Sequence, residues 1–299
     1  MNKIFVIGSS NTDMVVKTDK LPLPGETRMG GIFFMNAGGK GANQAVAASR
    51  LGADVKLICK LGNDIFGKQT LANFENEHID ITDIFMDEYT ASGTALIIVN
   101  AEGENSIVVA PGANANLLPA DIERIKNLSE AEIVLMQLEI PMETLGYIAE
   151  KVKANHQRLI INPAPAQILD DRVLDGLFLI TPNESEAYLL TGIQVNDEAS
   201  ASAAADVFLK KGVQNIIITL GSRGAYFQNS FLKIKLDAPV VQVMDTTAAG
   251  DTFNGAIAVA LMEKRDWKQA LEFAIEAASL SVTRMGAQSS VPYRHELSS

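Results

Sequence analysis

The chain has 299 residues, of which 47% are hydrophobic, and it carries a formal net charge of −11 at pH 7. This apolar content is ample for a buried core, and the negative charge excludes a broad surface for nucleic acid or for an acidic membrane. The single cysteine, Cys59, excludes an internal disulfide, and we expect it to pack in the core of a protein from a reducing compartment. The first apolar run is too short for a signal peptide, and no run approaches the ~18 residues of a membrane span, which favours a cytoplasmic location.

Short β-rich runs alternate with helical patterns along most of the chain. Nearly continuous apolar runs predict buried parallel strands at 3–8, 55–61, 133–138, 159–161, 177–180 and 215–219. Helical periodicity, with glycines placed as stops, predicts helices at 42–51, 66–77, 141–154, 184–190 and 199–211. This alternation predicts an α/β fold in which helices flank a doubly wound, mostly parallel sheet.

Two regions depart from this alternation. Segment 28–36 and the pair 93–100 and 105–110 have strand character without crossover helices, and the pair reads as a hairpin with alternating faces. We therefore expect a single α/β domain over 1–299, with insertions at approximately 12–36 and 91–111 that form a small β-sheet lid. An edge sheet with unpaired strands tends to pair with another chain, so we expect a homodimer that forms through the lid.

The segment 245–251, Asp-Thr-Thr-Ala-Ala-Gly-Asp, precedes an apolar helix. A helix that starts near Ala249 directs the unpaired amides of 248–251 toward the loop, where they form an anion site. Asp251 in the first turn is favoured by the helix dipole. The spacing alone leaves open that Asp245 begins a turn and that Asp251 only caps the helix.

Two glycine-rich turns precede or follow predicted elements. Segment 36–43, Asn-Ala-Gly-Gly-Lys-Gly-Ala-Asn, is not a Walker A loop, because Lys40 is followed by glycine and position 34 is phenylalanine. It is either a turn that brings backbone, Lys40 and Asn43 close to a small polar ligand or a helix-starting turn without a ligand. Segment 219–224, Thr-Leu-Gly-Ser-Arg-Gly, follows a strand where open α/β sheets bind ligands.

Polar residues also recur where predicted strands end, at Asn11, Asp13, Glu139, Asn183 and Glu186. Each one alone fits a turn former or a helix cap, but their recurrence favours a binding site. The turn after the last long helix, 282–292, exposes carbonyl oxygens that suit a hard cation. The three histidines lie in polar contexts without metal-ligand spacing, and we expect them on the surface.

Seven motifs occur in order along the chain, at 8–13, 38–43, 137–139, 181–186, 219–224, 245–251 and 286–292. Together they resemble the phosphofructokinase-B/ribokinase family of carbohydrate kinases. The patterns Gly-Gly-Lys-Gly-x-Asn at 38–43 and Asp-Thr-x-x-Ala-Gly-Asp at 245–251 are specific to that family. The resemblance covers essentially the whole chain and implies a ribokinase-like fold and the transfer of the γ-phosphate of ATP to the 5-hydroxyl of D-ribose, giving D-ribose 5-phosphate.

The same resemblance implies a role for each matching residue. Asp251 is expected to be the catalytic base, in an anion hole formed by the amides of Ala248, Ala249, Gly250 and Asp251. The expected sugar-binding set is Asn11, Asp13, Gly39, Lys40, Gly41, Asn43, Glu139 and Asp251. The expected ATP set is Asn183, Glu186, Thr219, Gly221, Ser222, Gly224 and Gly250, in which Glu186 organises Mg²⁺ through water. The expected K⁺ site consists of Asp245, Thr247, Ser281, Arg284, Gly286 and Ser290.

One position departs from the family pattern. Where relatives often carry an asparagine near the adenine, this chain has Ile275, which leaves the adenine contacts of that helix open. Two alternatives to a ribose kinase also remain at this point. One is a kinase for another small sugar or nucleoside, such as deoxyribose, fructose, a keto-deoxy sugar acid or adenosine. The other is a sugar-sensing module without turnover.

Overall fold

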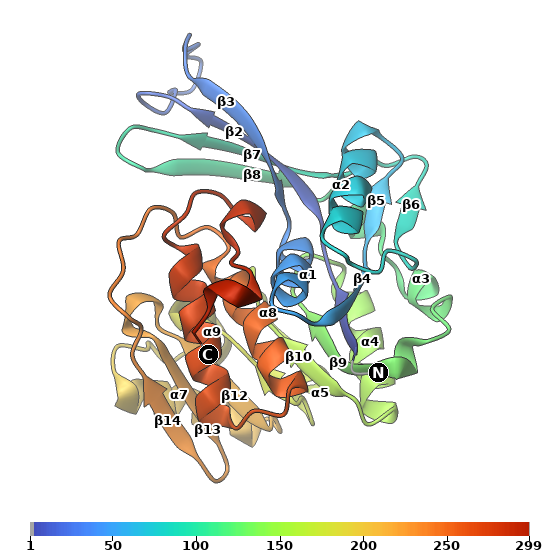
Figure 1. The fold of residues 1–299 in the computed structure, drawn as a ribbon, viewed down its shortest axis with the longest axis vertical. Helices are drawn as coiled ribbons and strands as arrows, with labels where there is room; N and C mark the ends of the chain where they lie inside the picture. The colour runs from blue at the N-terminus through green and yellow to red at the C-terminus, as the bar shows by residue number, and fades with distance from the viewer. Residues whose placement is uncertain (1–2, 299) are drawn as a thin grey trace.

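The structure is a computed structural model that describes residues 3–298. Its body is an eight-stranded sheet in the order β14-β13-β12-β11-β10-β9-β1-β4, in which the strands from β12 to β4 are parallel (Figure 1). This confirms the predicted α/β fold with a mostly parallel sheet. The strands are β1 Lys3–Ile7, β4 Asp54–Ile58, β9 Ala131–Met136, β10 Arg158–Ile161, β11 Leu179–Ile180, β12 Asn215–Thr219, β13 Ala225–Asn229 and β14 Lys233–Leu236.

Helices cover both faces of this sheet. Alternate residues of β1 point to opposite faces, so Ile4 and Val6 join one buried cluster, whereas Phe5 and Ile7 join the other. The first cluster packs against α1, α8 and α9, and the second against α4 and α7. The helices are α1 Lys40–Arg50, α2 Ile65–Asn76, α3 Pro119–Glu123, α4 Met142–Ala154, α5 Asp171–Leu174, α6 Glu184–Thr191, α7 Glu198–Lys210, α8 Ala249–Met262 and α9 Trp267–Ser281.

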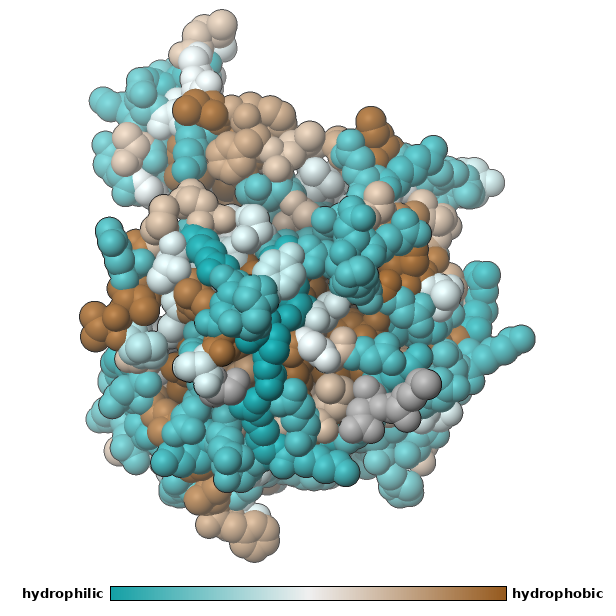
Figure 2. Space-filling model, in the orientation of Figure 1, coloured by the Kyte–Doolittle hydropathy of each residue, from teal (hydrophilic) through white to brown (hydrophobic). Residues whose placement is uncertain are grey.

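A four-stranded sheet, which we call the lid, lies above the carboxyl ends of the parallel strands (Figure 1). Its order is β3-β2-β7-β8, with β2 Asn11–Lys17, β3 Ile32–Gly38, β7 Gly93–Val99 and β8 Asn105–Ala110. The register places Asp13, Ala95 and Val109 in one cross-strand row. The next row, Met14, Leu96 and Val108, therefore points to the opposite face. Figure 2 shows apolar side chains gathered over this part of the molecule.

Two local predictions were wrong, and a third was confirmed. The run 55–61 is two strands, because after Ile58 the chain leaves the main sheet and β5 Lys60–Gly62 pairs with β6 Phe85–Asp87 in a separate sheet. Segment 28–36 contributes only its last residues to β3. The hairpin predicted for 93–100 and 105–110 is present as β7 and β8 with alternating faces, although β8 is exposed along its whole length as the edge of the lid. The run 55–61 is largely apolar, so its sequence does not indicate that the chain passes from one sheet to another within it.

No helix among residues 3–298 combines the length and the apolar character needed to cross a membrane.

Candidate functional site

The loops after the parallel strands and the N-termini of α1 and α8 meet under the lid (Figure 1). They enclose a cavity of about 710 Å³, which we call the lid cavity. The lid contributes Ala95, Ile97, Ile107 and Val109 to its wall. Its polar lining brings together most of the predicted sugar-binding set, namely Asn11, Asp13, Gly39, Lys40, Asn43, Glu139 and Asp251.

Gly41 does not line the lid cavity. It is buried in the first turn of α1, where a Cβ atom would lie 2.6 Å from the backbone nitrogen of Ser9. A residue with a side chain would therefore push α1 away from the loop that follows β1. Gly41 allows the close approach of these two segments, and we assign it no direct contact with a ligand.

A second cavity of about 710 Å³, which we call the turn cavity, lies on the other side of the start of α8. Its polar lining includes Asn183, Thr219, Gly221, Ser222, Gly224, Thr246 and Gly250. Its remaining wall is largely apolar and includes Val240, Val243, Phe253, Ile275 and Val282. The structure thus places the predicted ATP residues together, with Glu186 as the exception.

Glu186 is buried and serves as part of a helix cap rather than as a wall of the turn cavity. Its carboxylate accepts a hydrogen bond of 2.8 Å from the amide of Asn183, and the Asn183 side chain accepts one of 2.8 Å from the amide of Glu186. This reciprocal capping box fixes the start of α6. Burial raises the pKa of Glu186, although Lys40 opposes the shift.

Asp251 is 7% exposed and lies in the first turn of α8. Its oxygen Oδ2 accepts a hydrogen bond of 2.9 Å from the Asn43 side chain, and Oδ1 accepts one of 3.0 Å from the Gln44 side chain. Burial raises the pKa of Asp251, while Lys40 and the two amide donors oppose that shift. A buried carboxylate with a raised pKa is a suitable proton acceptor near neutral pH.

The loop before α8 makes a sharp turn at Ala248, which has φ +59° and is the N-cap of the helix. The amide of Ala249 donates to the carbonyl of Thr246 at 3.3 Å, so this predicted anion-hole donor already has an internal partner. The space beside the Cα of Gly250 is open to 4 Å. Of the four predicted donors, the amides of Gly250 and Asp251 in the first turn are therefore the best placed for an anion.

The other ionisable groups of the lid cavity are coupled to Asp251. Burial and the charges of Glu139 and Asp251 raise the pKa of Asp13 to about 6. Burial disfavours the charged form of Lys40, but the surrounding carboxylates outweigh this effect and raise its pKa. Oxygen Oε2 of Glu139 accepts hydrogen bonds from the Ser9 hydroxyl at 2.5 Å and from the Lys40 amide at 2.9 Å.

The predicted cation segments contact one another through Asp245. Its Oδ1 accepts from the amide and hydroxyl of Thr247, at 2.9 and 2.6 Å, and its Oδ2 accepts from the amide of Gly286 at 2.9 Å. The Ser290 hydroxyl is buried and donates to Ala287. The carbonyl of Ser281 accepts from the amide of Arg284, whose guanidinium pairs with Glu296 at 2.6 Å. Because the guanidinium is itself positively charged, Arg284 could contribute only its backbone carbonyl to a cation site.

Three residues of this region were missed by the sequence interpretation. Ser9 orients Glu139, Gln44 contacts Asp251, and Asn114 donates to the side-chain oxygen of Asn11 at 2.8 Å. Each contact joins positions more than 100 residues apart in the chain. Two signals were available in the sequence, because Ser9 lies within the motif at 8–13 and Gln44 directly follows the family pattern at 38–43.

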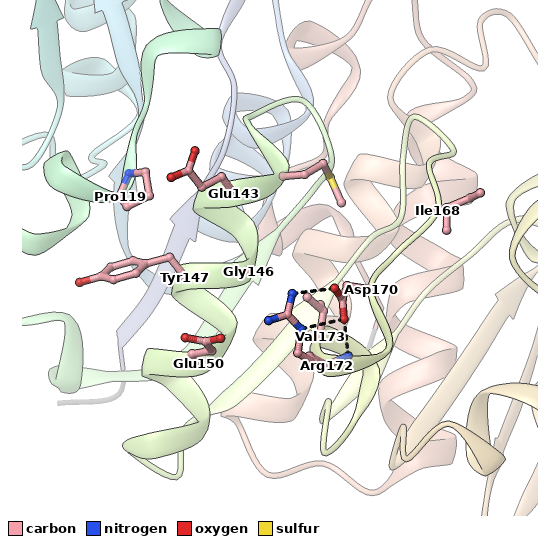
Figure 3. Close-up of a pocket in the computed structure, with 10 residues that line it drawn as sticks. Pro119, Glu143, Gly146, Tyr147, Glu150, Ile168, Asp170, Arg172 and Val173 are labelled. Atoms are coloured by element: carbon pink, nitrogen blue, oxygen red, sulfur yellow. Dashed lines mark hydrogen bonds and ion pairs between the residues drawn. The ribbon is translucent and has the colours of Figure 1, made fainter.

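A further surface pocket lies between α4 and the segment around α5, and none of the predicted site residues lines it (Figure 3). Its arginine, Arg172, is bonded to Asp170 at 2.8 Å. Across residues 3–298, no group of three or more His, Cys, Asp or Glu side chains is arranged to hold a metal ion. The lid and turn cavities are therefore the candidate site.

Comparisons with known proteins agree with this geometry. The family model described as "pfkB family carbohydrate kinase" matches residues 1–294. A ribokinase of Haemophilus influenzae is 44% identical over 98% of this chain and 96% of its own length. A deoxyribokinase of Salmonella typhi is 38% identical over 97% of this chain and 95% of its own length. The structure of an Arabidopsis thaliana ribokinase complexed with ribose and ATP is similar, with a TM-score of 0.91, 32% identity and coverage of 98% and 96% of the two chains.

Proposed function

Because the chain belongs to the pfkB family of carbohydrate kinases, we propose that the lid and turn cavities are the sugar and nucleotide halves of a ribokinase site. The enzyme transfers the γ-phosphate of ATP to the 5-hydroxyl of D-ribose. The observation that carries this assignment is that both cavities reach the first turn of α8, where Asp251 faces the lid cavity and Gly250 the turn cavity. An acceptor and a donor bound on these two sides meet across one helical turn.

In the reaction, Asp251 accepts the proton of the 5-hydroxyl while the sugar oxygen forms its bond to the γ-phosphorus. The bond between that phosphorus and the β,γ-bridging oxygen breaks, so the electron pair leaves with ADP. The amides of Gly250 and Asp251 and the dipole of α8 stabilise the charge on the transferred group. Lid residues Ile107 and Val109 line the cavity wall opposite Asp251, where a bound sugar would cover them and leave less room for water, which competes as the acceptor.

Ribose binds through the polar lining of the lid cavity. Asp13 and Glu139 accept from hydroxyl groups, while Lys40, Asn11 and Asn43 supply donors, a combination that discriminates among neighbouring hydroxyls. Ser9 and the Lys40 amide occupy Oε2 of Glu139, so we assign Oε1 to a sugar hydroxyl. Gly39, at φ +88°, allows the backbone to turn close to the sugar.

ATP binds in the turn cavity, with its phosphates toward Gly250 and its base among Val240, Val243 and Ile275. Asn183, Thr219, Gly221, Ser222 and Gly224 complete this site. Ile275 gives the base an apolar contact and no side-chain hydrogen bond. Magnesium is held mainly by the phosphates and water, because no acidic cluster of the described residues is arranged to bind it alone. Glu186 acts on that ion only through water.

A K⁺ ion binds beside the anion hole, supported by the contacts that join Asp245, Thr247 and Gly286. The backbone of Ser281, Arg284 and Gly286 and the side chain of Ser290 would hold this ion. The negative charge of Asp245 balances the cation. The bound ion steadies the loop that leads into α8.

We further propose the organisation and setting of the enzyme. Residues 1–299 form a single domain with lid insertions at approximately 12–36 and 91–111, and the enzyme is a cytoplasmic homodimer that pairs through its lids. The support for the dimer is the exposed apolar surface of the lid, where Phe33, Leu96 and Val108 are 58%, 54% and 67% exposed. Contiguous apolar surface of this kind is typical of interfaces.

Incubation with ribose and MgATP, followed by a coupled assay for ADP and by ³¹P NMR of the product, tests the assignment. We expect ribose 5-phosphate, and a higher kcat/KM for ribose than for 2-deoxyribose, fructose or adenosine. A higher kcat/KM for 2-deoxyribose would make the protein a deoxyribose kinase instead. Nucleotide binding without ADP release for any acceptor would replace the enzyme by a sugar-sensing module.

A further inference from the structure

The second amide that holds Asp251 comes from a residue outside both cavities. Asn43 contacts Oδ2 of Asp251 and also lines the lid cavity. Gln44 contacts Oδ1, is fully buried and lines neither cavity. A contact between Gln44 and either substrate is therefore excluded, and its effect on the reaction has to pass through Asp251.

The orientation of the Gln44 amide is fixed by its three partners. Its nitrogen donates to Oδ1 of Asp251 at 3.0 Å and to Oδ1 of Asn162 at 3.1 Å, which uses both of its hydrogens. Its oxygen accepts from the Gln137 side chain at 2.6 Å. An ionised carboxylate only accepts hydrogen bonds, so the flipped amide would place two acceptors against each other.

The network continues from Asn162 to the backbone of α8. Asn162 donates to the carbonyl of Thr181 at 3.2 Å, and the Thr181 hydroxyl donates to the Asn254 side chain at 2.6 Å. Asn254 then donates to the carbonyl of Gly250 at 2.8 Å. One buried network therefore holds both the carboxylate of Asp251 and the turn that carries the anion-hole amides.

Close packing of α1 and α8 makes this contact possible. A Cβ atom at Gly255 would lie 2.6 Å from the Cβ of Ala47 and 2.9 Å from the carbonyl oxygen of Gln44. The glycine therefore lets the two helices approach until the Gln44 side chain reaches Asp251. The orientation of the Asp251 carboxylate therefore depends on the position of α1.

We propose that Gln44 is a positioning residue for the phosphoryl transfer, which fixes the rotation of the Asp251 carboxylate so that it faces the acceptor hydroxyl. This inference rests on the proposed function, in which Asp251 is the base. Asn43 alone leaves the carboxylate free to turn about the bond between Cβ and Cγ. Misplacement of a reacting group by about 1 Å can lower a rate by about 100-fold.

The test replaces Gln44 by methionine, which has a similar length and no donor. For Gln44→Met we expect kcat to fall by about 10- to 100-fold, with a change in the ribose KM of less than about 3-fold. The acid limb of the kcat profile should move to higher pH, because an amide that favours the ionised base is lost. Lys40, Asp13, Glu139 and Glu186, the charged groups around Asp251, are unchanged in the variant.

A matched control is Gln228→Met. Gln228, in β13, is 2% exposed and also makes three side-chain hydrogen bonds, with Ser202, Tyr226 and Asp206, but none with the candidate site. The Gln228→Met variant should lose a comparable amount of stability, but its kcat per folded molecule and the acid limb of its kcat profile should stay at the wild-type values. If Gln44→Met behaves like this control, Gln44 is only structural and the proposal is overturned.

A second variant covers the case in which Gln44→Met does not fold. Gln44→Glu keeps the size and polarity of the side chain but places a second carboxyl group against Asp251, which should move the acid limb further toward higher pH. An unchanged acid limb in Gln44→Glu overturns the proposal. The wild-type assay with ribose, run in parallel, tests the proposed function separately, because its failure would appear without any substitution.

Discussion

Four carboxylates, those of Asp13, Glu139, Glu186 and Asp251, surround the single ammonium group of Lys40. Burial, and to a smaller extent the repulsion among these carboxylates, raises the pKa values of Asp13, Glu186 and Asp251. The arrangement is costly for folding, since like charges repel and water is partly excluded. It suits a site that binds a neutral polyol and takes a proton from it.

Replacement of Asp251 by asparagine removes the base and keeps the shape of the side chain. For Asp251→Asn we expect kcat to fall by about 10²- to 10⁴-fold, with a smaller change in the ribose KM, because general-base catalysis acts mainly on the transition state. Steady-state kinetics at saturating ATP measure both constants. A variant with kcat close to the wild-type value would rule Asp251 out as the base.

Asp13 offers a test of the cost of the site. The pKa of Asp13 is raised to about 6, so the folded state favours the protonated carboxyl group. This preference contributes fully to the free energy of unfolding below about pH 4, and the contribution is lost as the pH rises through 6. We expect Asp13→Asn to increase the free energy of unfolding at pH 8 by about 1–3 kcal/mol. At pH 4 the difference should be small.

Urea unfolding at the two pH values measures this difference. The same variant should bind ribose more weakly, because an amide replaces a hydrogen-bond acceptor. Equal stability of wild type and variant at both pH values would show that Asp13 is not held in a strained ionised state. The control is Glu26→Gln, which removes an exposed carboxylate near the tip of the lid, whose pKa is lowered rather than raised. It should not share the gain in stability at pH 8 that we expect for Asp13→Asn.

At the level of elements, two loops that are far apart in the sequence are joined by one carboxylate. Asp245 links the loop before α8 to the turn at Gly286, which has φ +93°. Arg50 of α1 steadies the same terminal segment by donating to the carbonyls of Gln288 and Val291, at 2.7 and 2.9 Å. The position of the proposed anion hole at the start of α8 therefore depends on the C-terminal turn.

If this turn holds K⁺, activity should rise when K⁺ replaces Na⁺ at constant ionic strength, because the smaller ion fits poorly among carbonyls spaced for the larger one. Asp245→Asn should remove most of the difference, since it removes the balancing charge. Initial rates in matched chloride salts provide the measurement. Equal wild-type rates in both salts would defeat the proposed cation site.

The sequence predicted the elements better than the contacts between them. Apolar runs and helical periods located β12 and α4 to within one residue, since local patterning determines such elements. The β13 and β14 hairpin was not predicted, because polar residues such as Gln228 and Asn229 interrupt the apolar pattern of β13. Conversely, the residues at 38–43 and 245–251 were identified through family motifs. Ser9 and Gln44 lie in or beside such motifs, but their contacts, like that of Asn114, join positions far apart in the chain and could not be predicted from local patterns.

At the scale of the whole molecule, one face of the lid sheet borders the lid cavity and the other face points away from it. All four side chains Ile107, Val109, Leu96 and Val108 are at least half exposed, but Ile107 and Val109 line the lid cavity, whereas Leu96 and Val108 point to the opposite face. We expect Val108→Glu to weaken the dimer, because it would bury a charge in an apolar interface. Light scattering after gel filtration measures the mass across a dilution series.

Phe231→Glu is the matched control for the dimer. Phe231 is 95% exposed on the turn between β13 and β14, at the opposite end of the molecule from the lid (Figure 1). The substitution Phe231→Glu removes an exposed apolar side chain without altering the lid. Equal masses for wild type and Val108→Glu at every concentration would argue against pairing through this face.

The alternation of side chains along β8 restricts how the lid can change during evolution. Insertion of one residue before Ile107 would turn Ile107 and Val109 away from the lid cavity and bring Val108 toward it. Insertion of two residues would preserve both faces and only lengthen the strand. Viable natural variants of this strand should therefore differ in length by even numbers, unless a bulge absorbs the odd residue. The wall of the lid cavity and the surface proposed for dimerisation therefore constrain each other through one short edge strand.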